Sequence, residues 1–146
     1  MKFFWIIIAF ASGAFLPLQA GLNTKLGKAI TSPVHASMIS FMVGVISVFV
    51  YTQLTSQPVS WAGVKAAPWY AWMGGVLGAF YVTAIILAFP KIGPALTFGL
   101  VVAGQMFMAV LLDHFNILVA QQHPVNLWRV LGIVLIIAGV IIIRKF

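Results

Sequence analysis

The sequence contains no cysteine and a single acidic residue, Asp113. The lack of cysteine excludes disulfides and thiolate sites. With one aspartate and no glutamate, no pair of carboxylates can share acid–base chemistry. The three histidines show neither the spacing of metal ligands nor a carboxylate partner. We therefore predict no catalytic, metal or cofactor site, and a protein that is not an enzyme.

Charged residues are also scarce. They make up 6% of the 146 residues, whereas 63% are hydrophobic, and a soluble domain carries about 25% charged residues. The hydrophobic residues form blocks without the alternation that a membrane barrel requires. We predict an all-α membrane protein, a bundle of five transmembrane helices in contact with the lipid bilayer. Its net charge of +7 comes from dispersed residues that flank the blocks, so we expect no nucleic-acid partner.

The five blocks cover about 3–22, 34–54, 69–89, 94–113 and 126–143. A hydrocarbon core of about 30 Å needs about 20 helical residues, and each block is close to that length. Pro90 and Pro94 predict a break between the third and fourth helices. The first block follows Lys2 and is also typical of a secretory signal peptide; we interpret it as the first helix of a single transmembrane domain, 1–146.

The basic residues predict how the chain is oriented. An odd number of spans places the two termini on opposite sides of the membrane. Lys2, Lys65 and Arg129 fall on the side of the N-terminus, and Lys25, Lys28, Lys91, Arg144 and Lys145 fall on the other side. Because the side richer in lysine and arginine faces the cytoplasm, the count favours a cytoplasmic C-terminus.

Several polar side chains lie inside the predicted spans. Gln19 and Asn23 are four residues apart on one helix face, and Gln105 lies in the middle of the fourth span. An amide in hydrocarbon needs a partner, so it either bonds to a neighbouring helix or faces a cavity. We predict a central polar site, a substrate pathway, from five residues: Gln19, Asn23, Trp72, Tyr81 and Gln105. Hydrogen bonds between helices remain the alternative.

Two further pairings follow from spacing. Asp113 ends the fourth span and is expected to form an ion pair with Arg129 at the start of the fifth. Small residues recur every three or four positions on several spans, as at Ser37, Ser40, Gly44 and Ser47, and predict packing seams. The seam on the fifth span consists of Gly132, Ile136, Gly139 and Ile143. We expect this seam to pack against a second protomer.

A set of residues spread over nearly the whole chain resembles the short, five-helix YdcZ-like branch of the drug/metabolite transporter superfamily. The matching positions are Gly13, Pro17, Gln19, Asn23, Leu26, Pro33, Ala36, Ser37, Phe41, Gly44, Trp72, Gly74, Gly75, Gly78, Gly93, Pro94, Gly104, Gln105, Asp113, His114, Phe115, Pro124, Arg129, Gly132 and Gly139. The stretch from Gly132 to Val140 also resembles the dimerisation helix of small multidrug resistance transporters.

The resemblance implies a small-molecule transporter protomer of the bacterial inner membrane, which works with alternating access as a dimer with a second copy or an inverted paralogue. It does not imply a substrate. The multidrug relatives carry a membrane-embedded glutamate in the first helix, where this chain has Gln19, and an amide does not exchange a proton. Proton antiport by that mechanism is therefore in doubt. The alternative is a non-transporting membrane assembly or accessory protein.

Overall fold

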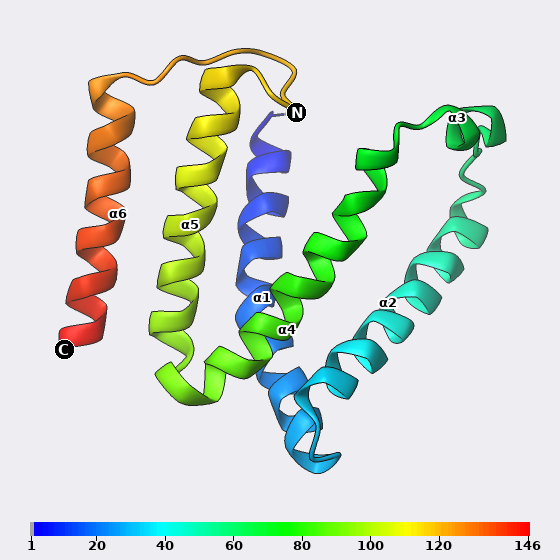
Figure 1. Ribbon diagram of the computed structural model, residues 1–146, viewed down its shortest axis with the longest axis horizontal. Coiled ribbons are helices and arrows are strands. Elements are labelled where there is room, and N and C mark those ends of the chain that lie inside the picture. Colours follow the sequence, from blue (N-terminus) through cyan, green and yellow to red (C-terminus); the bar gives the residue numbers. More distant parts are fainter. Residues whose placement is uncertain (1) are drawn as a thin grey trace. The chain divides into compact units, whose positions relative to one another are not determined.

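A computed structural model describes residues 2–146, and the chain divides into two compact units, one up to Lys91 and one from Ile92 onward (Figure 1). The elements are α1 (Lys2–Ala29), α2 (Pro33–Thr55), α3 (Trp61–Ala66), the 3₁₀ turn η1 (Trp69–Trp72), α4 (Met73–Ile92), α5 (Pro94–Phe115) and α6 (Leu127–Lys145). Five helical segments are long and apolar enough to span a membrane, and residues 2–146 contain no strand. The predicted all-α class with five spans is confirmed.

The first helix is longer than predicted. α1 ends at Ala29 and not near residue 22, because residues 23–29 contain no proline, and Lys25 and Lys28 are good helix formers. Its 28 residues give a length of about 42 Å, against about 30 Å of hydrocarbon. The last turns of α1 therefore extend into the headgroup region, which is where lysines are favourable.

The break between the third and fourth spans is also displaced. The predicted end near residue 89 was wrong, since Pro90 lies inside α4 and the helix continues to Ile92. A proline removes one helical hydrogen bond but does not always end a helix. The chain turns at Gly93, whose φ of +78° suits glycine, and Pro94 then occupies the first turn of α5.

A hairpin of α1 and α2 forms the most closely packed part of the first unit. Gly27 is buried, and a Cβ added there would lie 3.2 Å from Pro33 Cα and 3.5 Å from Ala36 Cβ. Ser32 caps α2 by accepting a hydrogen bond from the backbone N–H of His35. From this tight end the two helices diverge (Figure 1).

α5 and α6 form the second unit and lie side by side (Figure 1). At Gly99 an added Cβ would lie only 2.9 Å from Val140 Cγ2, so the absence of a side chain lets α6 approach. Val110 and Val140 are buried between the two helices. Thr97 of α5 is also buried, and its hydroxyl donates to the carbonyl of Gly93.

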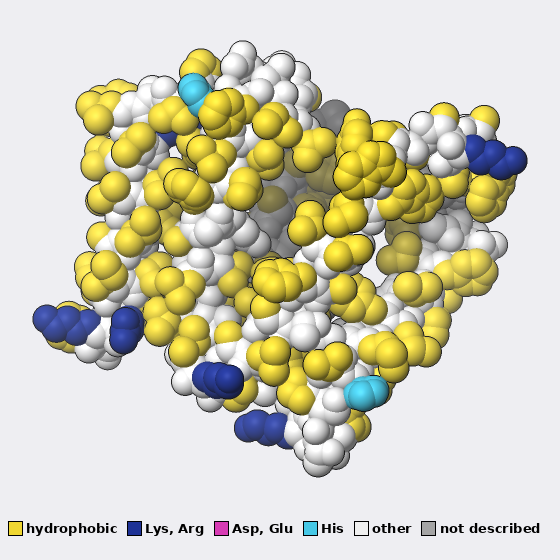
Figure 2. All heavy atoms as spheres, in the orientation of Figure 1, with side chains coloured by type: hydrophobic (Ala, Val, Ile, Leu, Met, Phe, Trp, Pro, Cys, Tyr) yellow, Lys and Arg dark blue, Asp and Glu magenta, His cyan; other side chains and the backbone are white. Residues whose placement is uncertain are grey.

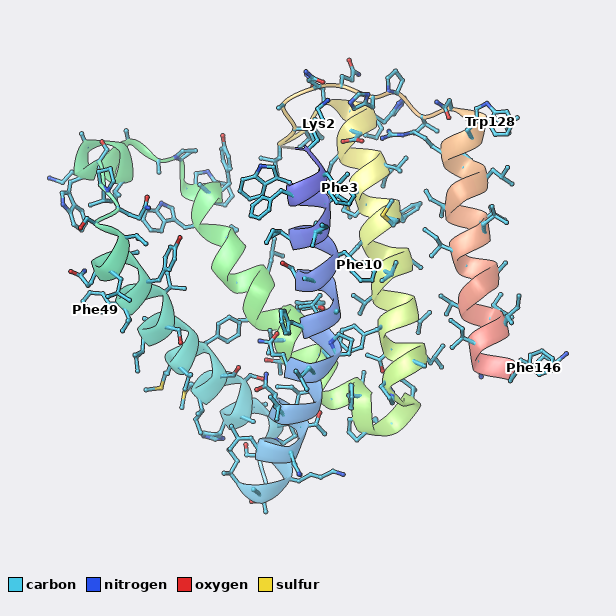
Figure 3. The ribbon with its side chains drawn as sticks, turned by 180° about the vertical axis from the view of Figure 1, so that it is seen from behind. Lys2, Phe3, Phe10, Phe49, Trp128 and Phe146 are labelled. Carbon is cyan, nitrogen blue, oxygen red and sulfur yellow. The ribbon has the colours of Figure 1, made fainter. Side chains whose placement is uncertain are left out.

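Most hydrophobic side chains of both units are exposed. Figure 2 shows them spread over the helices, with lysine and arginine side chains gathered at helix ends. Figure 3 shows the ends of α6, with Trp128 near its start and Phe146 after its last turn. Helices with apolar faces and charged ends are typical of membrane-spanning segments.

Candidate functional site

Three of the five predicted pathway residues meet in the first unit. Gln19 and Asn23 of α1 and Tyr81 of α4 line one small cavity together with apolar side chains that include Ile85 and Ile86. Its volume is about 10 Å³, roughly what the centre of one water molecule needs. The four-residue spacing of Gln19 and Asn23 places both on the same face of α1.

The polar atoms around this cavity have unmet hydrogen-bonding capacity. Asn23 is only 8% exposed, and its Nδ2 finds no partner among the described residues. The Tyr81 hydroxyl is likewise buried without a partner, as is Thr24 Oγ1 nearby in sequence. An unpaired polar group in a medium without water costs about 1–3 kcal/mol in proteins. These groups are thus suited to a water molecule or a ligand that accepts hydrogen bonds.

Gln19 also lines a much larger hollow, of about 620 Å³. We call it the glutamine hollow; α1 contributes Gln19, α4 contributes Val82, and α2 contributes Ser40, Phe41, Gly44, Val45, Val48 and Phe49. Gly44 is the middle residue of α2, so the hollow lies near the centre of that span. Figure 3 labels Phe49 on α2, and this side chain is exposed.

A second hollow adjoins the first. We call it the methionine hollow; its volume is about 640 Å³, and it is lined by Val34, Ser37, Met38, Phe41, Met42, Val45 and Ile46 of α2 with Gly75, Ala79 and Thr83 of α4. Phe41 and Val45 line both hollows. Cavities of this size with few polar groups are typical of small-molecule sites.

The other two predicted pathway residues do not join this cluster. Trp72 is the last residue of η1 and is 61% exposed. Gln105 lies exposed on α5, in the second unit. Their placement in a shared polar site therefore stays a prediction.

The structure brings Asp113 and Arg129 together at the mouth of the α5–α6 hairpin. Arg129 Nη2 donates to Asp113 Oδ2 at 2.5 Å, and its Nη1 donates to the carbonyl of His123 at 2.7 Å. The backbone N–H of His123 in turn donates to the carbonyl of Asp113. One guanidinium thus holds both the end of α5 and the loop before α6, which is a structural role within the second unit.

The predicted dimer seam is partly covered within the chain. Ile136 and Gly139 are half-buried, whereas Gly132 and Ile143 are exposed. A Cβ added to Gly132 or Gly139 would meet no atom within 4 Å. Neither glycine is therefore required by the packing of α6 within the protomer.

Sequence reasoning missed the contribution of α2. The stripe that contains Ser40 and Gly44 predicted a packing seam, but both residues line the glutamine hollow. The stripe itself was a usable signal, since small residues such as serine and glycine in a span are also found in cavity walls. What the spacing could not show is that α2 diverges from α4 and leaves the stripe uncovered.

Comparison with known proteins places the chain in a family. The sequence model of the family described as "Putative inner membrane exporter, YdcZ" matches residues 4–142. The chain is 26% identical over 142 residues to the inner membrane protein YdcZ of Escherichia coli (strain K12), covering 92% of this chain and 91% of the relative. No solved structure matches the chain significantly.

Proposed function

Since the chain belongs to the family described as "Putative inner membrane exporter, YdcZ", we propose that it is a small-molecule transporter protomer of the bacterial inner membrane that works as a dimer with alternating access. The family assignment supports a transporter-type function, and the five apolar spans fit a multi-pass membrane protein. The dimer, the alternating access and the export direction are parts of the proposal.

The observation that carries the proposal is the set of unpartnered polar groups inside the spans. Asn23 and Tyr81 have buried atoms without hydrogen-bond partners, and Gln19 connects their small cavity to the glutamine hollow. In a purely structural bundle these polar groups would form hydrogen bonds with neighbouring helices. Polar groups that face a hollow at the middle of a span are instead typical of a substrate path.

Alternating access requires two halves that rock around a central site. Five spans are an odd number and cannot supply an inverted repeat of themselves. A second copy, or a paralogue in the opposite orientation, would supply the missing half. The exposed Gly132 and Ile143 leave part of α6 free for such a partner.

Transport itself can be tested with purified protein in proteoliposomes loaded with a mixture of metabolites and drugs. We expect protein-dependent efflux of a subset of compounds, and loss of that efflux in Asn23→Leu. If folded wild-type protein moves none of them and no compound raises its thermal stability, the alternative of a non-transporting accessory protein is favoured.

A further inference from the structure

Phe41 of α2 lines both hollows between α2 and α4. The two helices diverge within the first unit (Figure 1), and the surface is hollowed between them (Figure 2). Phe41 reaches across from α2, with its Cζ 4.0 Å from where a Cβ on Gly78 would lie. The methionine and glutamine hollows share Phe41 and Val45 in their linings.

The two hollows differ in their free polar groups. In the glutamine hollow, the exposed Gln19 amide and the half-buried Ser40 hydroxyl make no hydrogen bond within residues 2–146. Other hydroxyls of α2 are bonded, since Ser37 donates to the carbonyl of Pro33 and Ser47 to that of Val43. A serine in a spanning helix satisfies itself in this way when nothing else is offered. Ser40 is thus available to an occupant of the hollow.

Neither hollow offers a counter-charge. The residues that line them include no lysine, arginine, histidine, aspartate or glutamate. The one acidic residue, Asp113, lies in the other unit and is paired with Arg129. An ion bound in either hollow would be stripped of water without a partner, which is strongly unfavourable.

We infer that the glutamine hollow binds a neutral, mainly apolar molecule that carries a hydrogen-bond acceptor such as a carbonyl or phosphoryl oxygen. The Gln19 amide N–H and the Ser40 hydroxyl donate to that oxygen, and Phe41, Val45 and Val48 contact the apolar body. This inference rests on the proposed transport function and adds the class of substrate to it.

Benzophenone is a suitable probe because it is apolar, has one carbonyl acceptor and cross-links to nearby C–H bonds under ultraviolet light. Purified protein in lipid nanodiscs is labelled, and the labelled peptides are mapped by mass spectrometry. Two competitors of related structure are compared, neutral triphenylphosphine oxide and cationic tetraphenylphosphonium. We expect competitor-sensitive labelling within residues 40–49, displaced by the phosphine oxide and not by the phosphonium.

Single variants identify the polar contacts. Gln19→Leu and Ser40→Ala are each expected to weaken displacement by triphenylphosphine oxide by about two- to tenfold, the effect of one lost hydrogen bond. Ser47→Ala is the matched control, because its hydroxyl is already bonded to Val43, and should leave displacement unchanged. Size-exclusion chromatography of each variant shows that it is folded.

Three results would overturn the inference. They are equal displacement by the cation, labelling that no competitor displaces because only lipid or water occupies the hollow, and variants that match the Ser47→Ala control. The proteoliposome assay is read separately. Selective binding without efflux would refute the transport function and leave the proposed binding site intact. Efflux of cations alone would support transport and refute the proposed binding of neutral molecules.

Discussion

At the scale of single residues, Asn23 is expected to lower the stability of the protein and to be required for its transport function. Its amide is buried with Nδ2 unpaired, which costs about 1–3 kcal/mol. We predict that Asn23→Leu, a change to an apolar side chain of similar volume, raises the midpoint of thermal unfolding in detergent. The same variant should lose efflux, since it removes a polar group from the site.

Tyr81→Phe provides an independent check, because it removes only the buried hydroxyl. It should shift stability and efflux in the same directions as Asn23→Leu, by smaller amounts. A fall in stability for both variants would indicate that water or a neighbouring helix satisfies these groups, and the site would then be structural.

The ion pair of Asp113 and Arg129 predicts an asymmetric pair of mutational effects. Both side chains are about a quarter exposed, at 24% and 28%, so solvent screens the pair and Asp113→Asn should cost about 1–2 kcal/mol. Arg129→Ala should cost more, because it also removes the hydrogen bond to the carbonyl of His123. Unfolding of both single variants and the double variant measures the coupling. Equal losses for the two single variants would contradict the role given to Arg129.

At the scale of elements, Gly99 sets the distance between α5 and α6. A Cβ there would lie 2.9 Å from Val140 Cγ2, and a β-branched side chain has no other favourable rotamer in a helix. We predict that Gly99→Ala destabilises the protein by about 1–3 kcal/mol in thermal unfolding. Gly104→Ala on the same helix meets no atom within 4 Å and should be neutral or stabilising. Val140→Ala should rescue Gly99→Ala, and failure to do so would place the strain elsewhere.

The spans themselves were predictable because a bilayer imposes length and composition on each of them. The residues at which α1 and α4 end were harder to predict from the sequence. Lys25 and Lys28 suggest a loop by polarity, yet they continue α1 because a helix that leaves the hydrocarbon remains a helix until a residue breaks it. Pro90 suggests an end by its chemistry, yet the turn falls at Gly93, where a positive φ is needed.

At the scale of the whole molecule, the sequence identified some polar members of the candidate site and missed its walls. Gln19 and Asn23 were predicted from their spacing on one helix. The contribution of Phe41 and Ser40 depends on the angle between α2 and α4, which hydropathy does not encode. Gln105 illustrates the same limit, since an amide at mid-span indicates a need for a partner but not where that partner is.

The dimer is the prediction that joins these levels, and the chain is well suited to test it because it has no cysteine. If two α6 helices cross antiparallel at Ile136, Gly132 of one protomer lies opposite Gly139 of the other. If they cross in parallel, each glycine lies opposite its own counterpart. The two positions are about 10 Å apart along the helix, beyond the roughly 7 Å that a disulfide spans between Cα atoms.

We therefore predict that co-expressed Gly132→Cys and Gly139→Cys protomers cross-link with each other in membranes, and that neither cross-links efficiently with itself. Val134→Cys, exposed on another face of α6, controls for random collision.

Labelling of the C-terminus from each side of the membrane then separates the two possible partners, a second copy and an inverted paralogue. Access from both sides supports an antiparallel homodimer. Absence of the cross-link together with access from the cytoplasm alone excludes the homodimer and leaves an inverted paralogue, because the excess of lysine and arginine on the C-terminal side then fixes the orientation of this chain. Self-cross-linking at both positions would instead establish a parallel pair, which supplies no inverted half and would contradict the proposed dimer.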